Sequence, residues 1–194
     1  DGPRREVLMG PNGLLAFLSQ EQIHVTFFVQ GWQAHANPDL IREMIQKDHL
    51  IANHTHGHAT PHEWARSLAR KDKRNWQALR KEEKDGYIRK GEIVFLRDAE
   101  RGRRTIQSLT GAIPLFMRPP KWDIDQDLYC ELSRTSIVQM IPGMVDVKRC
   151  PALSKIIPHV DVNTTDYEVI KWYVDELRRS GKEKQLFAAA VAKV

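Results

Sequence analysis

The 194-residue sequence has only two cysteines and no long apolar stretch. Cys130 and Cys150 are too few for a disulfide scaffold and too far apart for a zinc knuckle. They allow either one disulfide or two buried thiols. No run approaches the roughly 20 apolar residues that cross a bilayer, and the charged residues 1–6 lack the apolar core of a signal peptide. The sequence therefore predicts no membrane span and leaves the compartment open.

Internal repeats and low-complexity tracts are also missing. The hydrophobic fraction of 41% is ordinary for a globular protein, and 194 residues fit one domain with a real core. We expect a single domain over residues 1–194. Because the chain opens at an interior-looking Asp1-Gly2-Pro3 instead of a methionine, we expect the natural chain to begin earlier.

The net charge of +5 is distributed unevenly along the chain. Residues 66–104 hold fourteen basic and seven acidic residues, so the rest of the chain is slightly acidic. Such a run is typical of a solvated helical face. It would also attract an anionic partner, such as an acidic cell-wall polymer or a nucleic acid.

Short β-like runs alternate with helix-like runs, which predicts an α/β layer architecture. Asn37-Pro38-Asp39 indicates a helix start with Asn37 as its cap, and Leu40, Ile41, Met44 and Ile45 form that helix's apolar face. A charged helical region covers residues 61–110, interrupted near Asp85-Gly86 and closed by Gly111. A last helix is expected at 166–179. The expected strands are 25–29, 50–52, 115–117, 136–140 and 156–162.

Two histidines four residues apart, His54 and His58, directly follow the expected strand 50–52. Ligands in parallel α/β sheets gather beyond the carboxyl ends of strands, so the pair lies where a site is expected. Two imidazoles and one carboxylate leave open positions on a catalytic metal. Asp1 is a candidate carboxylate. This ligand set alone also permits a non-haem iron oxygenase.

The ordered motifs resemble the polysaccharide deacetylases of the NodB-homology group, carbohydrate esterase family four. Asp1-Gly2-Pro3 is similar to the end of the family's first motif, and His54-Thr55-His56-Gly57-His58 is similar to its His-(Ser/Thr)-x-x-His motif. Residues 25–31 resemble its Ala-Thr-Phe-Phe-Val-x-Gly strand. Arg118-Pro119-Pro120 and the segment 163–167 resemble its third and fourth motifs. The resemblance implies a distorted (β/α) barrel with a charged helical insertion around residues 61–110.

The resemblance also implies a set of roles. Asp1, His54 and His58 would hold one divalent metal, zinc first and cobalt as an alternative. Arg118 would orient the general base. Asp166 would act in the site or cap the last helix, and Trp122 and Tyr167 would stack on a sugar ring or lie in the core. The remaining histidines, His49 and His62 among them, are expected at the surface or behind the ligands, with His56 turned away from the metal.

The family's general base precedes Asp1 and its general acid lies in a late Leu-x-His motif, so we expect a domain truncated at both ends. The resemblance implies metal-dependent removal of N-acetyl groups from chitin, peptidoglycan or poly-N-acetylglucosamine, outside the cell, in the periplasm or at the cell wall. Esterase action on acetylated xylan is the nearest variant. Hydrolysis of small cyclic amides, with a changed metal site, is a rival within the same fold. Asn163 stands where the family usually has an aspartate, which motivates a different class, a catalytically impaired carbohydrate-binding domain. The basic run motivates a third, nucleic-acid binding, although the motifs favour a polysaccharide partner.

Overall fold

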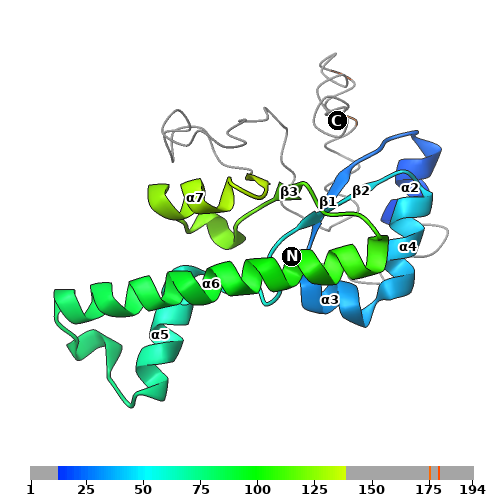
Figure 1. Ribbon diagram of the computed structural model, residues 1–194. Helices are drawn as coiled ribbons and strands as arrows, with labels where there is room; N and C mark the ends of the chain where they lie inside the picture. The colour runs from blue at the N-terminus through cyan, green and yellow to red at the C-terminus, as the bar shows by residue number, and fades with distance from the viewer. Residues whose placement is uncertain (1–12, 139–174, 176–178, 180–194) are drawn as a thin grey trace.

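The computed structural model describes residues 13–138 together with Asp175 and Arg179. Four parallel strands form its sheet in the order β1-β2-β3-β4, and each pairs with its neighbour along the chain (Figure 1). Their bounds are β1 Thr26–Val29, β2 Leu50–Asn53, β3 Phe116–Met117 and β4 Ile137–Val138. β1 pairs with β2 from Thr26 opposite Leu50 to Val29 opposite Asn53. The parallel sheet with intervening helices confirms the predicted α/β fold class, and the described strands form an open sheet.

Six α-helices and two 3-10 turns connect and flank these strands in the described part of the chain. None of these helices has the length and apolar character that a membrane span requires. The α-helices are α2 Leu14–Gln20, α3 Gly31–Ala36, α4 Pro38–Gln46, α5 Pro61–Lys71, α6 Lys81–Thr110 and α7 Gln126–Leu132. The 3-10 turns are η1 Trp76–Ala78 and η2 Pro120–Trp122.

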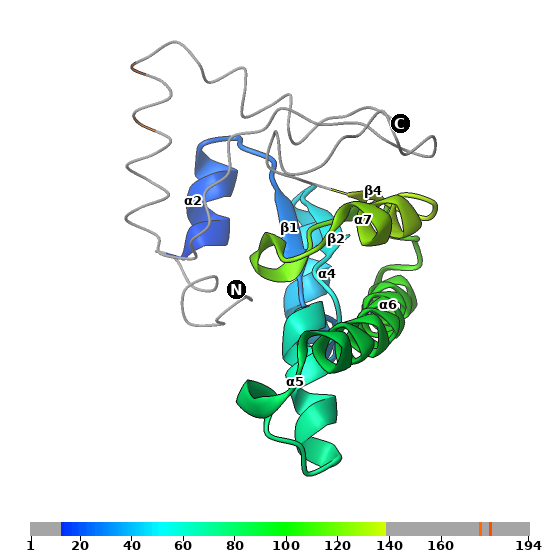
Figure 2. The same ribbon diagram turned by 90° about the vertical axis from the view of Figure 1, so that its left-hand side faces the viewer.

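The 30-residue helix α6 joins two apolar clusters. Ile106, in its last turns, packs with Leu40, Ile41 and residues of α2. Phe95, which lies earlier on the same buried face of α6, packs with Met117 and with residues of α7. Its buried positions recur at intervals of three to four residues, which is the period of one helix face. α6 therefore spans the molecule and carries its own N-terminal half away from the sheet, where it pairs with α5 (Figures 1 and 2).

The predicted interruption at Asp85-Gly86 is wrong, because α6 runs through both residues. The break in the charged region lies instead at residues 72–80, between α5 and α6. Asp72 ends α5, and the Glu83 carboxylate accepts a hydrogen bond from the Arg80 backbone N–H at the start of α6. Glycine within a helix costs only about 1 kcal/mol, which a long packed helix tolerates. Gly111, with φ of 75°, ends α6 as predicted.

Several smaller expectations need correction. Ile45 is exposed, and the α4 face consists of Leu40, Ile41 and Met44. Asn37 precedes α4 but does not cap it with its side chain; α3 ends directly before it, and its amide donates to the Gln33 carbonyl instead. His49 is buried, and its ring packs edge-on against that of Phe27.

Other sequence-based expectations involve residues outside the described range. They are Asp1, Cys150, the strand 156–162, Asn163, Asp166 and Tyr167. Asp175 and Arg179, which belong to the predicted helix 166–179, are helical. Cys130 is disulfide-bonded, so it is not a free thiol.

Candidate active site

The segment from His54 to His58 directly follows β2. Its first residue stays in register with the sheet, because the His54 N–H donates to the Val29 carbonyl at 3.0 Å. The chain then turns sharply: Thr55 and His58 have φ of 63° and 61°, in the left-handed region that non-glycine residues seldom adopt. The Thr55 hydroxyl, fully buried, accepts from the His58 N–H at 3.0 Å. This turn brings the side chains of His54 and His58 together.

The two imidazoles face each other with ring centroids 4.8 Å apart and planes inclined at 66°. His54 Nδ1 lies 2.7 Å from the Arg118 carbonyl oxygen. A carbonyl can only accept, so Nδ1 carries the proton and Nε2 keeps its lone pair. Burial lowers the pKa of His54 to about 4. Burial, followed by the charge of Lys121, also lowers the pKa of His58, so both rings are neutral at pH 7.

This arrangement fits a divalent metal. Metal-binding histidines characteristically donate their second ring N–H to a carbonyl or carboxylate, as His54 does to Arg118. Neutral imidazole is the form that binds zinc or cobalt. Within residues 13–138, Asp175 and Arg179, no group of three histidine, cysteine or carboxylate side chains is assembled. The third predicted ligand, Asp1, lies outside them.

Arg118 and Trp122 follow β3, the neighbour of β2. The Arg118 N–H donates to the Asn53 carbonyl at 3.0 Å, which continues the strand pairing to the site. Its guanidinium lies over the Phe28 ring at 4.4 Å and over the Trp122 ring at 5.5 Å. Trp122 also packs against the apolar cluster of Phe95 and Met117. It therefore contributes to the core and, through its ring, positions Arg118.

An ion pair and a hydrogen-bonded contact join the first turn of α5 to η2 and to Asp123, the residue after it. Glu63 binds Lys121, and His62 Nδ1 lies 3.0 and 3.1 Å from the Asp123 carboxylate oxygens. Lys121 and Trp122 both have left-handed φ, so these contacts hold a backbone that few non-glycine residues favour. The sequence predicted His62 only as a surface residue or a residue behind the ligands, and it gave no site role to Glu63 or Lys121. Nothing in the sequence pairs these residues, because 58 to 61 positions separate the partners.

Helix α6 holds residues 53–57 through hydrogen bonds. The Asp98 carboxylate accepts from the Gly57 N–H at 2.9 Å, and the Asp98 carbonyl accepts from the His56 N–H at 3.1 Å. The Ala99 carbonyl accepts from the buried Asn53 side chain at 2.9 Å. A Cβ on Gly102 would lie 2.5 Å from Asn53 Oδ1 and 2.6 Å from the Thr55 carbonyl carbon. Because Gly102 has no side chain, the backbone of α6 can pack directly against Asn53 and Thr55 at the end of β2.

Comparisons with known proteins show the family and the fold of the chain. The polysaccharide deacetylase family profile matches residues 1–139. The chain is 27% identical over 138 residues to a chitooligosaccharide deacetylase of Rhizobium leguminosarum bv. trifolii, which covers 68% of this chain and 61% of that protein. It spans about three fifths or less of the length of the curated relatives it matches.

Two solved structures share the fold. A family 4 acetyl xylan esterase from Clostridium thermocellum, in complex with a cobalt ion, superposes with a TM-score of 0.55 at 16% identity, covering 93% of this chain and 82% of the esterase. The peptidoglycan deacetylase PdaC from Bacillus subtilis gives a TM-score of 0.51 at 20% identity, covering 71% of this chain and 53% of PdaC. At such identities the likeness concerns the fold alone.

Proposed function

We propose that this chain, which belongs to the polysaccharide deacetylase family, removes N-acetyl groups from an amino-sugar polymer by hydrolysis of the amide C–N bond. The observation that carries the proposal is the pair of facing, neutral imidazoles at the end of β2, with His54 oriented by the Arg118 carbonyl. Chitin, peptidoglycan and poly-N-acetylglucosamine are the candidate polymers. The named relatives include a chitooligosaccharide deacetylase and a peptidoglycan deacetylase, which supports this choice.

His54 and His58, with Asp1 as the third ligand, would hold one divalent metal. Zinc fits neutral imidazole and carboxylate ligands, and cobalt is the alternative. When bound, such a metal lowers the pKa of a water ligand toward about 7 and polarises a carbonyl oxygen. The hydrogen bond from Nδ1–H of His54 to the Arg118 carbonyl leaves Nε2 unprotonated as an electron-pair donor.

The other residues would bind and orient the reactants. The guanidinium of Arg118, which lies over the Phe28 and Trp122 rings, would present its N–H fork to the carboxylate of the general base. Trp122 and Tyr167 would contact the apolar face of the sugar. Asp166 would take part in the site or cap the last helix. Because the substrates are wall polymers, we place the protein outside the cell, in the periplasm or at the cell wall.

Acetate release from N-acetylglucosamine oligomers, with added zinc or cobalt, tests the activity. The chain should be extended at both ends so that the family's general base and acid are present. Zinc-dependent release that falls at least about a hundredfold in His54→Ala would support the proposal. No release from the extended chain would refute it and favour the catalytically impaired sugar-binding domain.

Metal binding gives a second, activity-independent measurement. Titration calorimetry with zinc should show one site that is lost in His54→Ala and in His58→Ala. The exposed His35 provides the matched control, because His35→Ala removes an imidazole on α3 outside the pair. Equal zinc affinity in all three variants would exclude the histidine pair as the metal site.

A further inference from the structure

The end of the α5–α6 hairpin is a separate, strongly basic surface. We call residues 70–81 the hairpin tip; they comprise the last two residues of α5, the connecting segment with η1, and the first residue of α6. The hairpin tip holds six basic residues and one acid, a net +5 that equals the net charge of the whole chain. Both views show it projecting away from the sheet (Figures 1 and 2). All of its side chains are exposed except the partly buried Trp76 and the buried Leu79.

Part of this charge is already paired. Glu83 accepts from Arg74 at 2.5 Å and from Arg80 at 3.4 Å, and the single acid, Asp72, accepts a hydrogen bond from the Tyr87 hydroxyl at 2.8 Å. The remaining four basic side chains are exposed and have no ion-pair partner among the described residues. They are Arg70, Lys71, Lys73 and Lys81.

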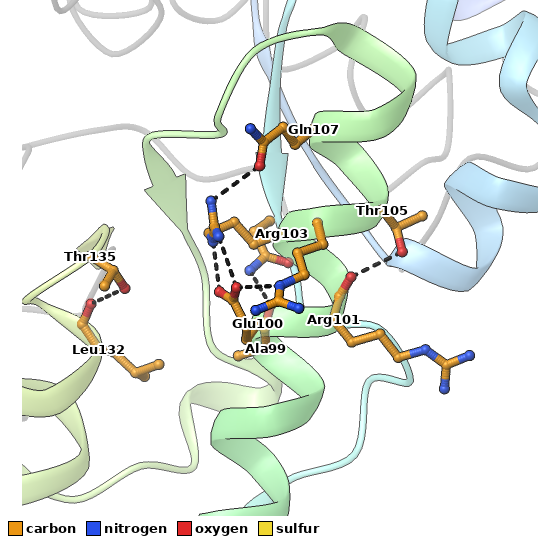
Figure 3. A network of polar contacts seen from close by, with 10 residues as sticks. Ala99, Glu100, Arg101, Arg103, Thr105, Gln107, Leu132 and Thr135 are labelled. Carbon is orange, nitrogen blue, oxygen red and sulfur yellow. Dashed lines mark hydrogen bonds and ion pairs between the residues drawn. The ribbon is translucent and has the colours of Figure 1, made fainter.

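The middle of α6 is organised differently. There Glu100 lies between Arg103 and Arg104, with N–O distances of 2.6 and 2.7 Å, and Arg103 also reaches Gln107 (Figure 3). The bond from Arg103 lowers the pKa of Glu100 to about 2, so the carboxylate stays ionised and offsets its neighbours. Glu83 offsets Arg74 and Arg80 in the same way, but Arg70, Lys71, Lys73 and Lys81 of the hairpin tip have no such partner among the described residues. Their positive field therefore acts on an approaching ligand.

An aromatic pair stands beside these charges. Trp76 of η1 is partly exposed and meets Tyr87 of α6 with ring centroids 6.5 Å apart, and the Lys90 ammonium lies 5.3 Å from the Tyr87 centroid. A flat apolar ring next to free ammonium groups suits a pyranose that carries a carboxylate. Three of the four unpaired groups are lysines, compact charges that attract anions without the bidentate geometry of arginine.

Helix α5 connects the candidate active site to the hairpin tip. α5 begins three residues after His58, and its 11 residues extend about 16 Å at 1.5 Å per residue. An extended polymer whose acetylated sugar lies at His58 can therefore follow α5 to the tip. We propose that the hairpin tip binds the negatively charged sugars of an acidic polysaccharide, and so selects an anionic polymer for the active site. The inference rests on the proposed function for the link between tip and site.

Binding to sodium polygalacturonate, measured by affinity electrophoresis of the full chain, tests this inference. The native chain should be retarded by polygalacturonate in a salt-sensitive manner and should not be retarded by neutral dextran. The triple variant Lys71→Gln/Lys73→Gln/Lys81→Gln should bind about tenfold or more weakly. Glu82→Gln, which removes an exposed acid beside Lys81, should bind more tightly.

The matched control is Arg42→Gln/Lys47→Gln/Arg134→Gln, which removes the same total charge far from the tip. Equal weakening by both triple variants would overturn the inference, because net charge alone would explain it. Tighter binding to a 20-base-pair duplex DNA than to polygalacturonate at equal salt would also overturn it. If the extended chain releases no acetate but still binds polygalacturonate through the tip, the proposed function is refuted and the tip's ligand class stands.

Discussion

Gly102→Ala tests the close packing of α6 beneath the histidine segment. Alanine is favoured over glycine within a helix by about 1 kcal/mol. At Gly102, however, the new Cβ would lie 2.6 and 2.7 Å from the backbone carbon and oxygen of Thr55, and backbone cannot rotate aside. Overpacking costs about 1–3 kcal/mol, and a double backbone contact falls at the upper end. The net loss in the free energy of unfolding should be about 2 kcal/mol.

Gly86→Ala is the control within the same helix, because a Cβ there meets nothing within 4 Å. It should gain about 1 kcal/mol, so the two variants should differ by about 3 kcal/mol. Urea unfolding followed by circular dichroism measures both. A loss of 2 kcal/mol corresponds to a fall in Tm of about 4–8 °C for a chain of this size. If Gly102→Ala proves as stable as Gly86→Ala, the contact between α6 and the end of β2 is not as tight as described.

Two further changes probe the site and the buried histidines. Arg118→Lys keeps the charge but loses the planar guanidinium fork that lies over Phe28 and Trp122, so acetate release should fall about tenfold or more. Zinc affinity should stay within about threefold, because His54 is oriented by the backbone carbonyl of residue 118, which the change keeps. Unchanged acetate release would refute a role for the fork. Burial lowers the pKa of His49 to about 4, below the 6.5 of an exposed histidine. Between those pH values the unfolded chain binds a proton that native His49 does not, so its contribution to stability is full above pH 6.5 and declines toward pH 4. His49→Gln should therefore flatten the fall in unfolding free energy between pH 7 and 4.5, and an unchanged slope in this variant would refute the account.

Local sequence patterns correctly predicted the strands and the helix end whose formation depends mainly on neighbouring residues. The apolar runs at residues 25–29 and 50–52 are strands, and Gly111 ends α6. The position of His54 and His58 beyond a strand also followed from the order of the runs. The predicted helix break at Asp85-Gly86 was wrong, because the glycine is a local sign of a break, whereas the packing of the long helix α6 keeps these residues helical. Ile45 was misassigned for the same reason, since the true edge of a helix face depends on its neighbour.

The sequence by itself determined the family, the parallel α/β class and the identity of the histidine pair, because these depend on residue order and periodicity. Only the tertiary structure decided how that pair is oriented. His54 takes its tautomer from a carbonyl 64 residues away, and Asn53 is held from a distance of 46 residues. The same holds for Glu63 and Lys121, and for the unpaired charges of the hairpin tip. Such contacts join distant positions whose proximity the fold creates, and no local pattern encodes which side chains meet.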